Sequence, residues 1–174
     1  MRRFISSFTL PFLLMVSATL SGCLGYQVGP VPPPYMAGVK TIAVPPFKNE
    51  TLYPRVEALL SQTVIQQIQQ DGTFTVGPER TSDVVLEGTV NNIRRTPARS
   101  IRGNVIATSE FELALEIQYK VIRSSNGQVL DQRKVTGTTT YFVGNDLQQD
   151  EAQAIPRAAQ NAAVRIVNLI TEGW

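Results

Sequence analysis

Alternation of apolar and polar residues between positions 105 and 121 constrains the fold of this chain more than any other feature. The apolar positions are Val105, Ala107, Phe111, Leu113, Leu115, Ile117, Tyr119 and Val121. The polar positions between them include Glu110, Glu112, Glu116, Gln118 and Lys120. A period of two over this length predicts a long strand with one buried and one wet face, as in antiparallel sheets. Asn126-Gly127 is a strong hairpin signal, so residues 129–143 should pair back against this strand.

Shorter apolar segments predict further strands. Residues 39–44 are β-branched and almost continuously apolar, which is typical of a strand covered on both faces. Residues 84–90 alternate as a second strand does, and residues 73–76 are compatible with a very short one.

Two segments have the spacing of helices. The first is capped near 49–51 and closed by Asp71-Gly72, and its apolar stripe consists of Leu52, Val56, Leu59, Leu60, Val64 and Ile68. The second spans about 146–171 with the stripe Ile155, Ala158, Ala159, Ala162, Ala163, Ile166 and Ile170, and Pro156 either kinks it or starts it. We therefore expect one α+β domain over 39–174, with two helices packed on one face of a mainly antiparallel four-stranded sheet.

The N-terminus has the pattern of an export signal. Arg2 and Arg3 precede an apolar run that is too short to span a bilayer, and the run ends in Ser21-Gly22-Cys23. This junction resembles the lipobox of bacterial lipoproteins, which implies that residues 1–22 are removed and Cys23 is acylated; an ordinary signal peptide with an incidental cysteine is the alternative. By the same resemblance, we expect residues 23–38 to form a lipidated, proline-rich spacer, and Leu24 after the cysteine to favour the outer membrane.

Composition narrows the possible functions. Arg2 and Arg3 account for the whole net charge of +2, so the mature chain is neutral, which argues against a nucleic-acid binder. The chain has no histidine, which removes histidine-based hydrolases, histidine-ligated zinc sites and histidine general bases. Cys23 is the only cysteine, so acylation leaves no thiol for a disulfide or metal site. We expect neither an enzyme nor a bound metal or cofactor.

A cluster of arginines lies between two predicted strands. Arg94, Arg95, Arg99 and Arg102 occur in a segment with no acidic residue between Glu87 and Glu110. Guanidinium groups bind phosphate and carboxylate bidentately, so the segment is a candidate anion site. The alternative is a solvated hairpin end whose arginines protect a sheet edge.

The order of these elements resembles the lipopolysaccharide-assembly lipoprotein family, LptE. The residues that carry the resemblance are the lipobox, Gly25-Tyr26, the proline-rich spacer, Ile42-Ala43-Val44, Pro46-Phe47, Asn49-Glu50-Thr51, the glutamine-rich helix, Asp83 to Gly88, the basic hairpin and the long paired strands. The resemblance implies a lipid-anchored outer-membrane protein that plugs an LptD-like β-barrel translocon and binds lipopolysaccharide. Arg102 best fits the family's basic contact, and Arg99, Arg95 and Arg94 fit it less well. Gly144-Asn145-Asp146 lacks the lysine that some members carry there.

Another class of lipoprotein shares part of this pattern. A strand followed by Val-x-Pro-Phe-x-Asn-x-Thr also occurs in lipoproteins that activate peptidoglycan synthases and in curli-secretion-type lipoproteins. The length of the strand predicted over 105–121 favours the barrel plug.

Overall fold

The computed structural model describes residues 32–99, 109–143 and 147–173. The predicted signal peptide, Cys23, Arg102 and the start of the predicted strand at Val105 and Ala107 lie outside these residues. The elements are η1 (Pro34–Met36), β1 (Thr41–Ala43), β2 (Lys48–Asn49), α2 (Val56–Asp71), β3 (Thr75–Val76), β4 (Val84–Arg99), β5 (Ser109–Arg123), β6 (Val129–Val143) and α3 (Leu147–Thr171).

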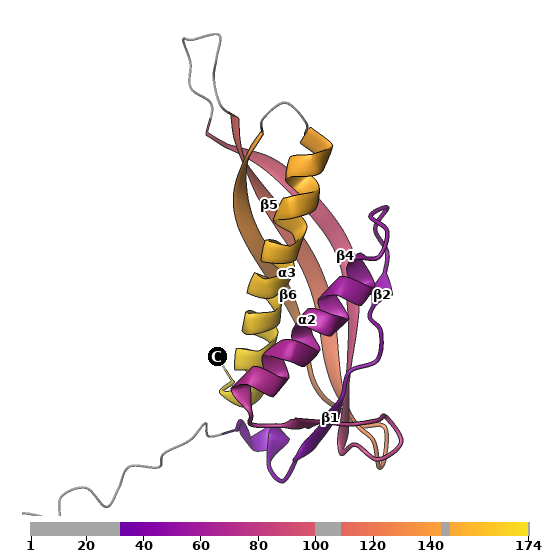
Figure 1. Cartoon of the computed structure of the whole chain (residues 1–174). Coiled ribbons are helices and arrows are strands. Elements are labelled where there is room, and N and C mark those ends of the chain that lie inside the picture. The colour runs from indigo at the N-terminus through magenta and orange to yellow at the C-terminus, as the bar shows by residue number, and fades with distance from the viewer. Residues whose placement is uncertain (1–31, 100–108, 144–146, 174) are drawn as a thin grey trace, which may run out of the picture. The chain divides into compact units, whose positions relative to one another are not determined.

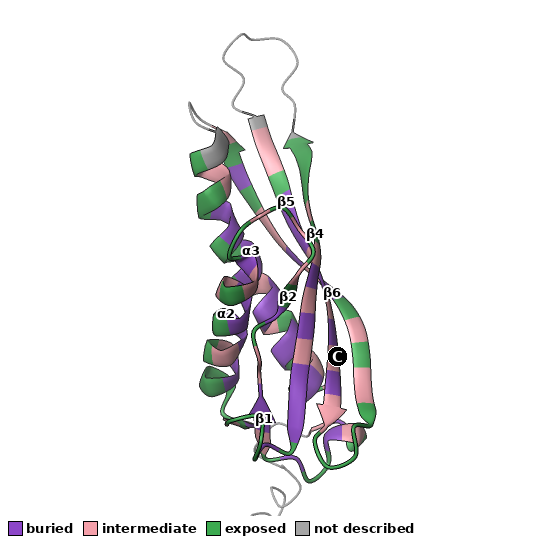
Figure 2. Cartoon of the chain, turned by 90° about the vertical axis from the view of Figure 1, so that its right-hand side faces the viewer, coloured by how far each residue is buried: buried purple, intermediate pink, exposed green. Residues whose placement is uncertain are grey.

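Three long antiparallel strands form the body of the sheet. β4 pairs with β5, and β5 pairs with β6 over almost its whole length. As predicted from its alternation, β5 has one buried and one solvent-facing side. Leu113, Leu115 and Ile117 are buried, while Glu112 is exposed (Figure 2). Gly127 has a φ of 71° and donates its N–H to the Arg123 carbonyl. Asn126-Gly127 therefore forms the turn that connects β5 to β6, as predicted.

The prediction of a mainly antiparallel four-stranded sheet was wrong. The sheet is mixed and has six strands in the described residues, in the order β3-β1-β4-β5-β6 with β2 also paired to β4. β1 is parallel to both β3 and β4, and β2 is parallel to β4. The helix α2 between β1 and β3 returns the chain to the starting end of β1, so β3 runs in the same direction. Strands of two or three residues are too short for a sequence pattern to reveal their partners.

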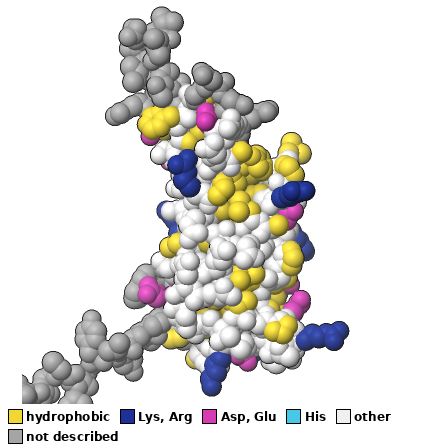
Figure 3. All heavy atoms as spheres, in the orientation of Figure 1, with side chains coloured by type: hydrophobic (Ala, Val, Ile, Leu, Met, Phe, Trp, Pro, Cys, Tyr) yellow, Lys and Arg dark blue, Asp and Glu magenta, His cyan; other side chains and the backbone are white. Residues whose placement is uncertain are grey.

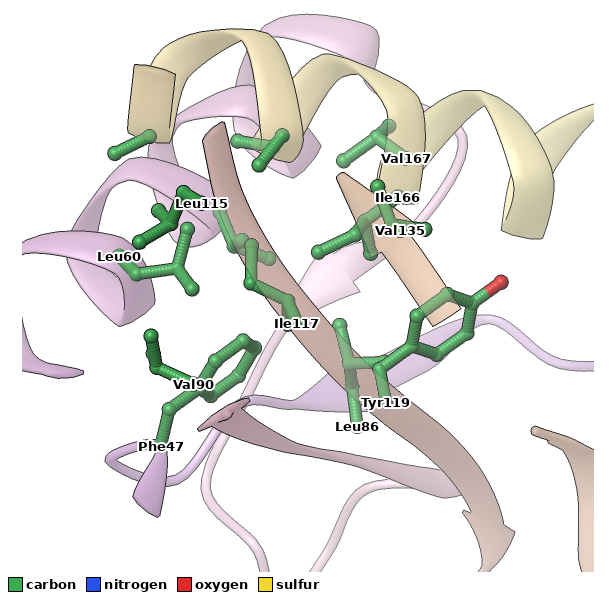
Figure 4. Packing of buried hydrophobic residues seen from close by; sticks show 14 of the residues in the cluster. Phe47, Leu60, Leu86, Val90, Leu115, Ile117, Tyr119, Val135, Ile166 and Val167 are labelled. Atoms are coloured by element: carbon green, nitrogen blue, oxygen red, sulfur yellow. The ribbon is translucent and has the colours of Figure 1, made fainter. Parts of the chain in front are cut away.

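The two helices cover one face of this sheet, as predicted (Figure 1). The side chains of the α3 stripe are buried, and they meet residues from β4, β5, β6 and α2 in one core (Figure 4). The closest approach is at Gly137 in β6, where an added Cβ would lie 2.2 Å from the Ala158 carbonyl oxygen and 2.6 Å from Cβ of Ala162. Pro156 lies inside α3 and therefore does not start it.

Helix α2 begins later than the sequence predicts. Arg55 has a left-handed φ of 65° just before Val56, the first residue of the helix. The Asn49 side chain organises the preceding turn, since it accepts the N–H and hydroxyl of Thr51 and donates to the Tyr53 carbonyl. Leu52 therefore lies in the turn and is fully exposed, so its assignment to the apolar stripe was wrong.

The compact unit that contains this domain begins at Val31. Pro33 and Met36 are buried, and Tyr35 donates its hydroxyl to the Leu169 carbonyl at the end of α3 (3.0 Å). The last residues of the predicted spacer therefore pack on the domain rather than apart from it.

Candidate functional site at the end of the β4–β5 hairpin

The predicted arginine cluster begins on β4. The pairing of β4 with β5 shifts register between Val90 and Asn92 and again between Pro97 and Arg99. Such bulges change the direction in which the following side chains point. Beyond the first bulge, Arg94 lies opposite Ala114 and Arg95 opposite Leu113, so the two arginines are on opposite faces of the sheet.

Arg94 lies on the face that carries no helix. Its guanidinium forms an ion pair with Glu116 of β5 at 2.9 Å. The side chains of Arg94 and Glu116 are 58% and 35% exposed, so water screens the pair and it contributes little to stability. A partner anion could compete for Arg94 at low cost.

Arg95 lies on the helix-bearing face and is held more firmly. It pairs with Glu151 of α3 at 2.9 Å, and its guanidinium carbon lies 5.7 Å from the centre of the Phe111 ring. Phe111 in turn contacts Tyr141 of β6, with ring centroids 6.1 Å apart. Arg95 thus joins the far end of β4 to the first turns of α3.

Tyr141 completes this contact from β6. Burial, followed by the charge of Glu151, raises the pKa of its phenol. Its hydroxyl is buried and has no hydrogen-bond partner among the described residues. The end of the helix-bearing face is therefore an aromatic and ionic joint between four elements, β4, β5, β6 and α3.

The remaining two candidates lie further along the same segment. Arg99 is the last residue of β4 and pairs with Glu110 in the register, while Arg102 lies outside the described residues. The structure therefore separates Arg94 from Arg95 and places each beside a carboxylate. Sequence reasoning missed both carboxylate partners; Glu151 is 56 positions from Arg95, and no local pattern links them.

On the face that Figure 3 shows, lysine and arginine side chains occur singly. Among the described residues, no three acidic, histidine or cysteine side chains are grouped so as to hold a metal ion. Within the same part of the chain, no helix has the length and apolarity needed to cross a membrane.

Comparison with known proteins gives a family match. The family model for lipopolysaccharide assembly, LptE, matches residues 39–170. No curated protein sequence matches the chain significantly.

Several solved structures have a similar fold. A Xanthomonas campestris protein is 18% identical with a TM-score of 0.54, over 83% of this chain and 95% of that one. A Helicobacter pylori homologue of the neuraminyllactose-binding hemagglutinin is 10% identical with a TM-score of 0.53, over 85% and 92%. PelC of Paraburkholderia phytofirmans, solved as a dodecamer, is 16% identical with a TM-score of 0.51, over 84% and 96%. At such low identity these likenesses establish the fold alone.

Proposed function

Because the chain belongs to the lipopolysaccharide-assembly family LptE, we propose that it is the lipid-anchored partner and plug of an outer-membrane β-barrel translocon. In this role it also binds lipopolysaccharide while the translocon inserts that lipid into the outer membrane. The family match over residues 39–170 is the observation that carries the proposal. The mechanism consists of binding and positioning and requires no bond to be made or broken.

The dimensions of the sheet suit a plug. Strands of 15 and 16 residues reach about 50 Å at roughly 3.3 Å per residue. This length exceeds the roughly 30 Å thickness of the hydrocarbon core, so one domain can fill a barrel lumen along its height. The face without helices carries polar side chains such as Glu112, Gln118 and Thr140, which match the polar interior of large barrels.

Acylation of Cys23 would hold the domain at the membrane. Each buried methylene contributes about 0.8 kcal/mol, so two or more acyl chains give stable anchoring. Pro33 is already buried in the domain, which leaves the stretch 24–32 as the tether. At about 3.5 Å per residue this tether reaches roughly 30 Å at most.

The arginines at the hairpin end are the proposed contact with lipopolysaccharide, whose phosphate and acidic sugar groups match guanidinium donors. Their contributions differ, because Arg95 also supports the packing of α3. The informative variant is therefore Arg99→Ala with Arg102→Ala, which leaves the Arg95–Glu151 pair intact.

The test is binding of purified mature domain to lipopolysaccharide, measured by titration at fixed salt. The double variant should bind at least about tenfold more weakly, since each charge-assisted contact contributes about 1.5–3 kcal/mol. Lys48→Ala, an exposed change on β2, is the matched control and should bind normally. Unchanged affinity in the double variant would remove Arg99 and Arg102 from the mechanism.

A further inference from the structure

The outer edge of β6 has no strand beside it in the described part of the chain. Native proteins usually protect such an edge, because its unpaired N–H and C=O groups can pair with another chain. In this protein, a side chain of α3 protects one position of the edge. The N–H of Thr138 donates to the Asn161 side chain of α3 at 3.2 Å, so this position of the edge is already occupied.

This hydrogen bond also reveals which residues face the edge. Thr138 directs its N–H away from β5, and alternate residues of an antiparallel strand direct both backbone groups to the same side. Lys134 and Thr136 therefore present their backbone groups to the open edge. In the described part of the chain, neither forms a backbone–backbone hydrogen bond outside the strand ladder.

A groove lies beside these two residues. It has a volume of about 450 Å³ and is lined by Lys134, Val135 and Thr136 of β6 and by Arg165, Asn168 and Leu169 of α3. Arg165 is one helical turn beyond Asn161 and lies on the same side of α3. The side chain of Asn161 occupies the edge at Thr138, whereas the edge beside Lys134 has no such bond from the described residues of α3. Val135 and Leu169 supply its apolar part.

The groove carries positive charge without an internal partner. Lys134 and Arg165 are both exposed, and neither forms an ion pair or a side-chain hydrogen bond within the described residues. Among the residues that the structure describes, no acidic side chain lines the groove. Glu116 lies opposite Thr136 in the strand register, and its carboxylate is paired with Arg94.

We propose that this edge binds an extended acidic segment of a partner protein, which adds a strand beside β6. The segment's backbone pairs with Lys134 and Thr136, as in other complexes formed by strand addition. Its successive side chains alternate between the two faces, so adjacent acidic residues meet Lys134 on one face and Arg165 on the other. This edge is separate from the arginine end of the hairpin, so a peptide that binds here is measured independently of the lipopolysaccharide titration proposed above.

The test uses a designed probe on the whole mature protein. The probe is a capped hexapeptide of valines and threonines with two adjacent glutamates at its centre. One control peptide has lysines in place of the glutamates. A second keeps both glutamates and replaces the valines with proline, which cannot donate a backbone N–H.

The acidic peptide should bind and slow hydrogen exchange at the amides of Lys134 and Thr136, measured by NMR, while both control peptides should fail to bind. The double variant Lys134→Glu and Arg165→Glu should weaken binding about tenfold or more. Lys48→Glu, on the other side of the sheet, should leave it unchanged.

Three results would each overturn the proposal. The acidic peptide does not bind; the proline peptide binds as well, which indicates charge recognition without an added strand; or inorganic phosphate displaces the acidic peptide at equal concentration, which indicates a phosphate or lipid-headgroup site.

Discussion

Arg94 and Arg95 are adjacent in the chain, yet the structure gives them unequal surroundings. Arg94 has one exposed carboxylate partner, whereas Arg95 has a less exposed partner and an aromatic ring beneath it. Exposed ion pairs contribute about 0.2–1 kcal/mol, and a cation–π contact adds about 0.5–1 kcal/mol. The difference between the two residues is therefore large enough to measure.

Arg95→Ala should lower the free energy of unfolding by about 1 kcal/mol, and Arg94→Ala by less than about 0.5 kcal/mol. Urea unfolding of the two variants and the parent protein measures both values. Part of the Arg95 effect should persist in high salt, because its contact with Phe111 is less screened than an exposed pair. Equal losses in the two variants would contradict the assignment of Arg95 to the joint with α3.

The close packing of β6 against α3 leaves no room for a side chain at Gly137. A methyl group added there would overlap the Ala158 carbonyl oxygen and Ala162, which belong to a rigid helix backbone. Gly137→Ala should therefore destabilise the protein by about 1–3 kcal/mol or more. Thr140→Ala, an exposed change on the same strand, should stay within about 0.5 kcal/mol of the parent. A Gly137→Ala variant as stable as the parent in urea would show that α3 does not lie this close to β6.

At the scale of elements, the N-terminal segment is fixed to the sheet by a shared carboxylate. Tyr119 donates its hydroxyl to Oδ2 of Asp131 at 3.1 Å, and Arg133 pairs with the same side chain. The Tyr35 hydroxyl lies 3.4 Å from the same oxygen and shares its one hydrogen between Asp131 and the Leu169 carbonyl. Burial, followed by the charge of Asp131, raises the pKa of Tyr35 to about 12 and raises that of Tyr119 further. Each phenol is therefore more easily deprotonated in the unfolded chain than in the folded one.

This difference predicts a pH dependence with a definite sign. The contribution of both phenols is fully present below the ordinary pKa of 10 and is lost as the pH rises through the folded values. Stability should therefore fall between about pH 10 and 12, and Tyr119→Phe should make that fall shallower. Urea unfolding from pH 8 to the highest pH at which the protein stays folded provides the measurement. An identical slope in parent and variant would contradict the arrangement.

The long elements were predictable from the sequence, because their periods repeat many times. The alternation in β5, the alanine stripe of α3 and the Asn126-Gly127 turn each specify a local structure. The parallel pairing of β1, β2 and β3 was not predictable, since two or three residues carry no period.

The start of α2 was misjudged for a related reason. The Asn49 side chain bonds to the turn before α2 and to the Glu57 side chain, and no side chain in the described part of the chain caps the first turn of the helix. A one-dimensional pattern does not distinguish these two arrangements. The candidate site was predictable only as a run of arginines. Arg94 and Arg95 lie on opposite faces of the sheet because they are neighbours in the β4 strand. Their carboxylate partners belong to β5 and α3.

On the scale of the whole molecule, the proposed function depends on where the helix-free face of the domain lies in the cell. The chain combines a family match over residues 39–170 with a long sheet whose helix-free face carries polar side chains such as Glu112, Gln118 and Thr140. A plug inside a barrel would be surrounded by its partner, so exposed positions on that polar face should contact the barrel wall. A regulator of a cell-wall synthase would place the same positions against a different protein.

Photo-crosslinking at Thr140, an exposed position on the helix-free face of β6, tests this claim most directly in cells that express the full chain. Cys23→Ser serves as the control, because a chain that is not lipid-anchored should form the adduct poorly. If the domain is a barrel plug, Thr140 should form a covalent adduct with a large outer-membrane β-barrel protein. An adduct with a peptidoglycan synthase, and none with a barrel, would contradict the proposed function.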